Sequence, residues 1–470
     1  MVLKLYDTLT RGVRDVFPMD EQTVRFYGCG PTVYGPAHIG NFRTFVMQDV
    51  FRRVLETSGQ KTFHVRNLTD VDDKTIRQSQ EEGLKLEDFT DKWTARFRKD
   101  CKLLNLMSPH AEPSAVSHIP EQISLIQRLI DAGKAYQASD GSVYFKVGAF
   151  SEYGRLSRLA DREITTNKTS RESSDEYDRE SAADFALWKA RRVEDGENYW
   201  ESPWGQGRPG WHIECSAICM KHLGESFDLH SGGVDLVFPH HENEIAQVEA
   251  VTCKRFARHW FHIAHLMVEG QKMSKSLGNL YTLEDLEEKG YKPEEIRYLL
   301  LSGNYRQPLN FTFDSLGAAR KALSKLTDFS RKFQIDQSPR KSLGTDFGDF
   351  HSVQEALLKD LNTPEALGRL FKIIRELSEA FERDEFNGKE DEMNRIRNGF
   401  RTTMDAFGLQ LKVKDEGPVE IPLEIQNLAE RRWEAKIAKD WGLADQLRRE
   451  LSDRGWLVKD GKDSFELAKV

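Results

Sequence analysis

The sequence predicts an α/β protein in which a parallel β-sheet with an insertion is followed by a helical bundle and a small C-terminal domain. Three observations lead to this prediction. Strand and helix patterns alternate over residues 24–130, which is typical of a parallel sheet. Helical periodicity then dominates residues 315–407 and predicts a bundle. A linker at residues 412–422, which contains one glycine and two prolines, separates a compact tail from the bundle.

The segment 26–41 is predicted to pass from a strand through a loop into a helix. Val24 and Phe26 alternate with polar residues at its start. After it, apolar residues repeat at i, i+4 and i+8, as they do on one face of a helix: Val46, Val50 and Val54.

The loop within this segment is a candidate phosphate site. A loop that enters a helix presents backbone N–H groups and the positive end of the helix dipole. His38 and Asn41 can both donate hydrogen bonds to phosphate oxygens, and Cys29 is a candidate metal ligand. The alternative is a plain strand-to-helix turn. Glycines that allow close approach of the backbone to a ligand are Gly28, Gly30, Gly35 and Gly40.

The next elements follow in order. Residues 61–66 are predicted as a strand, and helices are predicted around 91–104 and 121–132. Residues 134–200 change character, with a strand-like piece at 143–146. The polar tract 161–181 has too many Ser, Thr, Asp, Glu and Arg residues to form a core, so we expect an insertion with a mobile surface loop.

Apolar segments return at residues 211–220 and 227–265, and the second is dense in Gly, His and Glu. Helices are predicted near 282–289 and 294–302, after a loop at 270–278. A polar linker at 336–347 interrupts the predicted bundle, and no internal repeat is visible.

Length and composition indicate a soluble globular protein. A chain of 470 residues is long enough for about three domains. No segment approaches the roughly 18 apolar residues of a membrane span, and the first residues lack the regions of a signal peptide. We therefore expect a cytoplasmic protein that does not bind membranes.

The cysteines and the net charge narrow the function further. Five cysteines, odd in number and widely spaced, argue against a disulfide framework and allow metal-binding or catalytic roles. The net charge of -8 does not decide whether nucleic acid binds, because phosphate contacts depend on local groups of Lys and Arg.

A second candidate phosphate loop contains Lys272 and Lys275, between the potential hinges Gly270 and Gly278. Two ammonium groups in such a loop can neutralise the charge that builds on a departing pyrophosphate. A lone Lys-x-x-Lys pattern usually lies on a solvated surface. Its combination with the His-x-Gly-Asn loop far upstream is what makes the pattern specific.

These two loops resemble the two signatures of class I aminoacyl-tRNA synthetases, the first at His38–Asn41 and the second at Lys272–Ser276. The surrounding segments closely resemble the cysteinyl-tRNA synthetase family, and the resemblance covers nearly the whole chain. The resembling segments are Cys29–Tyr34, Asn67–Lys74, Gly210–Cys215, His230–Glu244, Tyr305–Phe311, Leu361–Ala366 and Lys439–Asp445.

The resemblance implies a catalytic domain with a Rossmann-type parallel sheet that is divided by an insertion. Its expected halves are residues 1–130 and 201–265, with a connective insertion at 131–200. The implied later parts are a signature-loop and stem-contact region at 266–318, a helical tRNA-binding bundle at 319–408 and an anticodon-recognition domain at 409–470.

A metal site is predicted from residue types and spacing. His240 and Glu244 share one face if their segment is helical, and Cys29 and Cys215 offer two thiolates that we expect at the ends of strands. Together they form a Cys2HisGlu set suited to zinc. In the resembling family the matching positions bind one zinc ion per chain, which holds the substrate's thiol.

Several alternatives to this ligand set are open. The zinc could be purely structural, although closed structural sites normally use Cys and His without a carboxylate. His241 could replace His240 as the ligand. Cys219 is better explained as a buried apolar cysteine. The H-E-x-x-H spacing of zinc proteases is absent, so that class is disfavoured.

Further site residues are implied by the resemblance, one position at a time. Trp211 resembles the aromatic residue that closes the amino-acid pocket, and Thr69 resembles a residue near the substrate's amino group. Asp235 resembles the acid that binds the ATP ribose, and His230 resembles a pocket histidine. The alternative for Trp211 is a core tryptophan. The alternative for Asp235 and His230 is a polar residue whose hydrogen bonds are all satisfied within the protein. The last position of the first signature is Asn41, where the name of the motif has His. The side-chain amide of Asn41 can still donate a hydrogen bond to a phosphate.

The implied reaction is ATP-dependent activation of L-cysteine, followed by transfer to the 3' end of tRNA, with Mg2+ accompanying ATP. We expect a monomer. Basic and aromatic residues of the tail are expected to contact tRNA, among them Arg431, Arg432, Trp433 and Trp441. Alternatives are a cysteine:amino-sugar ligase of the mycothiol pathway and a catalytically silent synthetase-like RNA- or nucleotide-binding protein.

Overall fold

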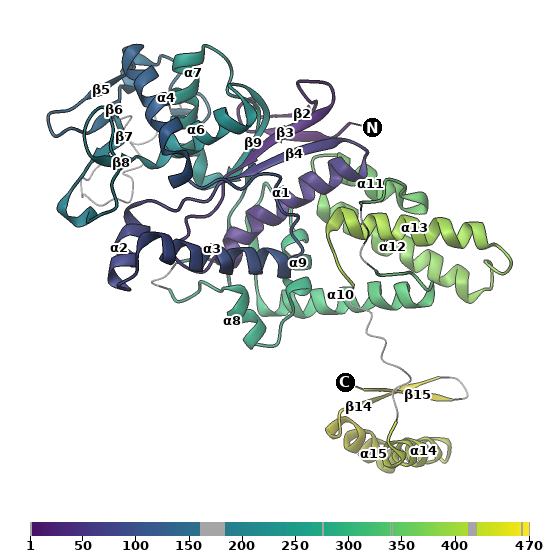
Figure 1. Ribbon diagram of the computed structural model, residues 1–470. Helices are drawn as coiled ribbons and strands as arrows, with labels where there is room; N and C mark the ends of the chain where they lie inside the picture. Colours follow the sequence, from purple (N-terminus) through teal and green to yellow (C-terminus); the bar gives the residue numbers. More distant parts are fainter. Residues whose placement is uncertain are drawn as a thin grey trace. The chain divides into compact units, whose positions relative to one another are not determined.

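The computed structural model describes residues 2–159, 184–274, 277–338, 340, 342–411, 421–461 and 464–469. The chain divides into two compact units, Met1–Leu411 and Lys412–Val470 (Figure 1). The polar tract predicted at 161–181 lies outside the described residues. No helix in the described part is both long and apolar enough to span a membrane.

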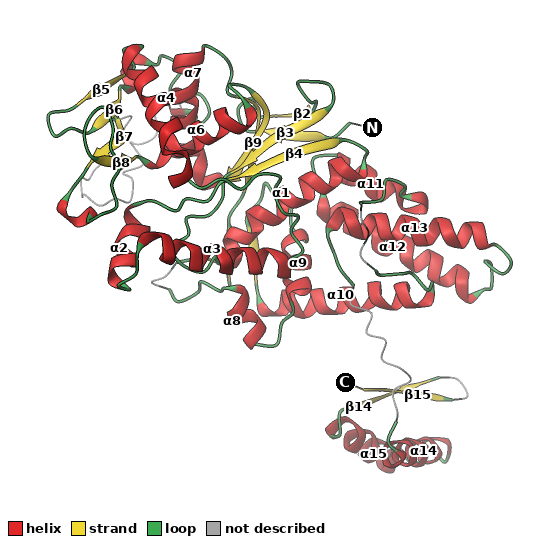
Figure 2. Ribbon diagram, in the orientation of Figure 1, coloured by secondary structure: helices red, strands yellow, loops and turns green. Residues whose placement is uncertain are grey.

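A four-stranded parallel sheet forms the centre of the first unit, as predicted. Its order is β10-β9-β3-β4, and every neighbouring pair is parallel. Figure 2 shows β3, β4 and β9 side by side. The prediction of an α/β fold is therefore confirmed. The strands are β3 Thr23–Gly28, β4 Lys61–Arg66, β9 Phe227–Gly233 and β10 Ala257–Ile263.

Helix α1, Ile39–Thr57, follows β3 through the loop that contains the first signature. His38 is its N-cap: its side chain accepts from the backbone N–H of Asn41, and the Asn41 side chain accepts from the backbone N–H of His38. This reciprocal pair satisfies two N–H groups that a helix start leaves without partners. The face predicted to be apolar is fully buried against the core at Val46, Val50 and Val54.

The inserted region forms a four-stranded antiparallel sheet of order β5-β6-β7-β8. Its last strand lies beyond residue 200, because β8 pairs with β7 just before the helix that follows. The strands are β5 Ala135–Gln137, β6 Val143–Phe145, β7 Phe185–Ala190 and β8 Gly207–Pro209.

Helices pack around both sheets. The helix predicted at 91–104 begins earlier, at Leu86, and the segment 211–220 is helical rather than extended. These helices are α2 Asp73–Glu81, α3 Leu86–Leu103, α4 Ile119–Asp131, α6 Trp211–Leu223 and α7 Glu242–Thr252. Short helical turns are η1 Val116–His118, η2 Val147–Ala149, η3 Val193–Asp195, η4 Val234–Leu236 and η5 Val237–His241.

A small sheet of order β12-β11-β13 carries the start of the second signature and is followed by the bundle. The strands are β11 Leu266–Val268, β12 Gln271–Lys272 and β13 Leu309–Phe311, and an N-terminal hairpin pairs β1 Lys4–Asp7 with β2 Gly12–Asp15. The remaining helices of this unit are α8 Leu283–Glu288, α9 Pro293–Leu301, α10 Phe313–Lys332, η6 Gly348–Phe350, α11 His351–Leu358, α12 Thr363–Glu382 and α13 Glu390–Phe407.

The second unit has its own small core. Two helices, α14 Leu423–Ile437 and α15 Trp441–Asp453, pack on an antiparallel hairpin of β14 Trp456–Asp460 and β15 Phe465–Lys469. The buried residues that hold it together include Leu428, Leu447, Leu451 and Trp456. Trp456 is thus a core residue of this unit.

A buried ionic cluster fastens α1 to the bundle and to α9. Asp49 of α1 accepts from Arg53 at 2.7 Å and from Arg297 of α9 at 2.5 Å, and all three side chains are buried. The two arginines also donate to backbone carbonyls of Asp405 and Phe407 at the end of α13. Burial alone would raise the pKa of Asp49, but the two guanidinium charges hold it below its usual value.

We expect Asp49→Asn to destabilise the first unit by about 3–5 kcal/mol, because it leaves two buried guanidinium groups without a counter-charge. Urea unfolding followed by circular dichroism measures this loss. Asp328→Asn is the control, since the Asp328–Arg331 pair is exposed and its loss should cost at most about 1 kcal/mol. Equal midpoints for the two variants would contradict the assigned role.

Candidate active site and metal centre

Four predicted ligands converge in the first unit. The Sγ atoms of Cys29 and Cys215, a ring nitrogen of His240 and a carboxylate oxygen of Glu244 all lie within 4.8 Å of one another, and all four residues are buried. Cys29 directly follows β3, as expected. Cys215 lies within α6 and not at the end of a strand, because the apolar segment that begins at Trp211 forms a helix.

Neighbouring histidines orient two of these ligands. The Nδ1 atoms of His212 and His240 share a hydrogen bond of 2.8 Å, and Nε2 of His230 lies 2.9 Å from Oε2 of Glu244. Nε2 of His240 and Oε1 of Glu244 then face one another at 3.1 Å. This contact does not have hydrogen-bond geometry, so the buried Oε1 of Glu244 has no hydrogen-bond partner among the described residues. Secondary contacts of this kind are typical of metal-binding imidazoles and carboxylates.

Burial disfavours the charged form of every member of this set. It raises the pKa of Cys29 to about 12 and that of Glu244 to about 8, and it raises the pKa of Cys215 well above its usual value. It lowers the pKa of His240 to about 4. A divalent cation would compensate two thiolates and a carboxylate, so the donor set fits zinc both in chemistry and in charge.

A second group of ligand atoms overlaps the first and consists of Cys29, His230, His241 and Glu244. Nε2 of His241 lies 3.2 Å from Sγ of Cys29, and its Nδ1 lies 2.7 Å from Nε2 of His262. The geometry therefore leaves His241 open as a ligand. We favour the first group because it contains both thiolates, which zinc prefers. Neither group includes Cys219.

The residues expected around the amino acid lie next to this centre. Trp211 stacks on His240 with ring centroids 4.3 Å apart. Thr69 donates through Oγ1 to Oε1 of Glu214 at 2.5 Å, and Glu214 precedes the ligand Cys215. Burial raises the pKa of Glu214 well above its usual value.

Two further residues at this site, His212 and Glu214, are not predicted from the sequence. Both stand in the resembling segment 210–215, so their position there was the only available signal. Their contacts with His240 and Thr69 join residues that are far apart in the sequence.

The first signature combines a structural and a candidate binding role. The capping pair uses Nδ1 of His38 and Oδ1 of Asn41, so Nε2 and Nδ2 are the donors that a phosphate would meet. Burial lowers the pKa of His38, and the nearby charge of Asp235 opposes this shift. Asp235 is therefore close enough to the first signature for its charge to act on His38, and its contact with the ATP ribose stays a prediction.

The second signature lies against the first. A Cβ added to Gly40 would approach Nδ1 of His38 to 2.9 Å and Sδ of Met273 to 3.0 Å, so the Met273 side chain of the second signature lies next to the first signature. The backbone N–H of Ile39 donates to the carbonyl of Tyr281 at 2.9 Å. Lys272 is exposed in β12. Lys275 lies outside the described residues.

Comparisons with known proteins agree with this arrangement. The family description "tRNA synthetases class I (C) catalytic domain" matches residues 15–321, and "DALR domain" matches residues 352–412. A cysteine–tRNA ligase of Opitutus terrae is 51% identical over 99% of both chains. The chain belongs to the cysteine–tRNA ligase family.

A second relative supports the same family, and a solved structure shares the fold. A cysteine–tRNA ligase of Solibacter usitatus is 45% identical over 98% of both chains. A Mycobacterium tuberculosis methionyl-tRNA synthetase in complex with methionyl-adenylate is 12% identical, with a TM-score of 0.57 over 83% of this chain and 92% of the other. At that identity the likeness shows a shared fold and no more.

The four residues expected to contact tRNA differ in exposure. Arg432 is buried and forms a two-pronged ion pair with Asp460, so its guanidinium joins α14 to β14. Trp433 packs beside Phe465. Trp441 is 61% exposed and Arg431 is also exposed. Within this family member, Arg432 is thus better explained as a structural residue, and the other three remain predicted contacts.

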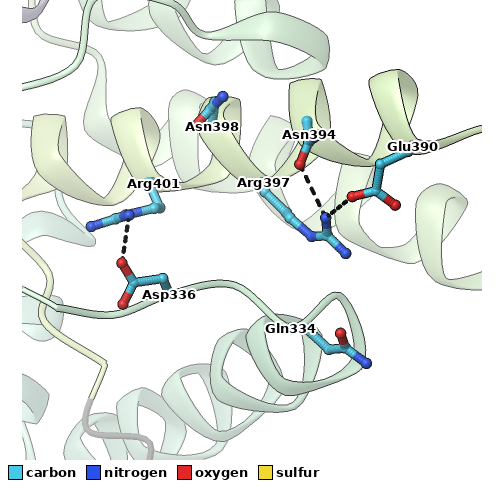
Figure 3. Close-up of a pocket in the computed structure, with 7 residues that line it drawn as sticks. All are labelled: Gln334, Asp336, Glu390, Asn394, Arg397, Asn398 and Arg401. Atoms are coloured by element: carbon cyan, nitrogen blue, oxygen red, sulfur yellow. Dashed lines mark hydrogen bonds and ion pairs between the residues drawn. The ribbon is translucent and has the colours of Figure 1, made fainter.

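The bundle of the first unit contains a polar pocket (Figure 3). Arg397 points toward Glu390 and Asn394, and Arg401 pairs with Asp336 at 3.0 Å. The charges that line the pocket are therefore largely compensated within it. The full lining is Gln334, Asp336, Glu390, Asn394, Arg397, Asn398 and Arg401.

The cap role of His38 predicts a difference between two substitutions. His38→Ala should lower the free energy of unfolding by about 1 kcal/mol, whereas His38→Asn should preserve it because Asn is a preferred N-cap. Thermal unfolding of both variants measures this. Thr312→Ala, which removes the cap of α10, supplies a reference value. A stable His38→Ala variant would show that the observed cap does not stabilise α1.

Proposed function

We propose that this chain activates L-cysteine with ATP and transfers the cysteinyl group to the 3' end of a cysteine-accepting tRNA. The observation that carries the proposal is the buried Cys2HisGlu group at the end of β3, the strand whose following loop contains the first signature. Family membership supports the same reaction. Mg2+ is proposed to accompany ATP.

In the first step, a carboxylate oxygen of cysteine bonds to the α-phosphorus of ATP, and the bond from that phosphorus to the β-phosphate oxygen breaks. His38 and Asn41 are proposed to donate to the phosphates. Lys272 and Lys275 are proposed to compensate the charge of the departing pyrophosphate. Asp235 would accept from the ribose. No side chain acts as a nucleophile, so the residues contribute orientation and electrostatic stabilisation.

In the second step, a ribose hydroxyl of the tRNA attacks the carbonyl carbon of the cysteinyl-adenylate, and AMP leaves. The buried Glu214, held by Thr69, is a suitable partner for the amino group of the substrate. Trp211 would cover the side-chain pocket from its position on His240.

Zinc held by Cys29, Cys215, His240 and Glu244 would supply the selectivity for sulfur by binding the substrate's thiolate. A purely apolar pocket rejects an analogue with a hydroxyl by only about a hundredfold. Zinc would discriminate between a thiolate and an alcohol far more strongly than such a pocket does, because it binds soft sulfur ligands better. With zinc bound, serine would therefore be excluded by the chemistry of its side chain and not by its size.

The second unit is the proposed site of anticodon recognition. Trp441 and Ile437 are 61% and 68% exposed and lie at the junction of α14 and α15. Exposed aromatic and apolar side chains next to basic residues such as Arg431 are suited to stack on unpaired bases.

The mycothiol-pathway ligase lacks support, because the relatives that match over nearly the full length are cysteine–tRNA ligases. A catalytically silent protein is disfavoured because the four ligands and both signatures are retained. A monomeric and cytoplasmic state stays a prediction, and size-exclusion chromatography with light scattering tests the first part.

We expect Cys29→Ser to lose bound zinc and at least a hundredfold of cysteine-dependent pyrophosphate exchange, because a ligand and its charge are removed. Metal analysis and exchange assays with cysteine and serine measure both effects. Cys253→Ser is the matched control, since Cys253 is exposed and belongs to neither ligand group. Full zinc content with normal exchange in Cys29→Ser would remove Cys29 from the site.

Removal of residues 412–470 should spare pyrophosphate exchange and reduce tRNA charging by at least a hundredfold, because the second unit is compact and separate. Within the full chain, Trp441→Ala should raise the KM for tRNA and leave the thermal unfolding unchanged. Arg432→Gln should instead lower the unfolding temperature of this unit, because it breaks the pair with Asp460. Equal loss of exchange and charging on truncation would contradict this division.

A further inference from the structure

The segment 304–311 contacts both signature regions and has no role in the proposed chemistry. It forms a turn closed by the bond from Gln307 N–H to the Asn304 carbonyl, and it ends in strand β13. We call residues 304–311 the bridge segment. One of its ends meets α1, and the other meets the small sheet that carries Lys272.

At the first end, Arg43 of α1 donates through Nη2 to the carbonyls of Gln307 and Asn304, at 2.5 and 3.1 Å. Arg43 is 1% exposed, and it forms no ion pair with a carboxylate in the described part of the chain. Its Nε and Nη1 have no hydrogen-bond partner among the described residues.

Such a burial is costly, since a charged group without a counter-ion loses most of its solvation. Burial lowers the pKa of Arg43 to about 10, so the group is still charged at neutral pH. Arg43 lies two residues after Asn41, on the helix that His38 caps. Arg43 thus joins the helix that carries the first signature directly to the bridge segment.

At the other end, Asn310 and Lys272 occupy one row of the small sheet, because both are paired with Met267 of β11. The Oδ1 atom of Asn310 accepts from the backbone N–H of Gly270 at 2.7 Å. Gly270 has a φ of 76°, the left-handed conformation that favours glycine, at the turn that leads into β12. This bond holds the turn from which Lys272 projects.

The bridge segment is also anchored independently of both signatures. The hydroxyl of Tyr305 donates to Oδ1 of Asp360 at 2.5 Å, and Arg306 pairs with the same carboxylate at 2.9 Å. The backbone of Tyr305 accepts from Ala264 N–H. A segment fixed in this way to the bundle and to the end of β10 can serve as a rigid reference for what it holds.

We propose that the bridge segment holds the two signatures in the relative positions that adenylate formation requires. Arg43 and Asn310 are the positioning residues: Arg43 acts through His38–Asn41, and Asn310 acts through Lys272. The inference rests on the proposed function. Phosphate stabilisation depends on donors placed to within about 1 Å, and a shift of that size costs up to about a hundredfold in rate.

The test is steady-state pyrophosphate exchange with the full-length zinc-loaded enzyme. Asn310→Ala should reduce kcat/KM for ATP by about ten- to a hundredfold, with KM for cysteine, zinc content and unfolding temperature unchanged. Asn310→Asp retains the acceptor for Gly270 N–H and should recover most of the activity. Asn387→Ala is the matched control, because Asn387 is an exposed bundle residue with one side-chain bond, and it should have no effect.

A double-mutant cycle tests whether Asn310 acts through Lys272. In a Lys272→Ala background, Asn310→Ala should cause no further loss, because the group that it positions is absent. Additive losses would overturn the proposal, as would an unchanged kcat/KM for ATP in Asn310→Ala or a parallel loss of cysteine binding and zinc.

Arg43→Gln tests the end of the bridge segment that meets α1. It is compared with Arg43→Lys, which retains the charge and one donor nitrogen. We expect the same ATP-specific loss for Arg43→Gln and partial recovery for Arg43→Lys. Should Arg43→Gln fail to fold, Asn310→Ala decides the question. Absence of cysteine-dependent exchange in the unmodified protein would refute the proposed function itself. Exchange that is present in the unmodified protein and unchanged in the variants would refute only the role of the bridge segment.

Discussion

Burial of two thiols, an imidazole and a carboxyl at one point is the constraint on which the rest of the active site depends. The four groups come from the end of β3, from α6, from η5 and from α7. A relative shift of these elements would leave buried polar atoms unpaired, at about 1–3 kcal/mol each. The apolar core beneath them, which includes Tyr27, Ile218, Ile245 and Trp260, holds the elements together.

Helix α1 connects this centre to the remainder of the first unit. Its N-terminus presents the first signature, Arg43 holds the bridge segment, and Asp49 joins α9 and the end of α13 through two arginines. Four charged side chains of α1 are buried and used for contacts within the protein: Arg43, Asp49, Arg52 and Arg53. A helix with so many fixed contacts provides a rigid base for phosphate-binding groups.

The second unit is stabilised in a different way from the first. Its core is small, and an ion pair between Arg432 and Asp460 also joins α14 to β14. Ile437 and Trp441 are left exposed at the junction of its helices. Exposed apolar surface on such a small unit is consistent with a binding role, which agrees with the proposed division between chemistry in the first unit and RNA recognition in the second.

The sequence by itself determined the α/β class, the bundle and the family, because periodicity, glycine-rich loops and short motifs are local properties. It also supplied the identities of the four candidate ligands, partly from residue types and partly from resemblance. Only the tertiary structure decided that Cys215 lies in a helix, that His212 and Glu214 support the centre, that Arg432 is buried and that Asn310 holds Gly270. In each case the partner is distant in sequence or the exposure depends on packing, and neither is encoded in a local pattern.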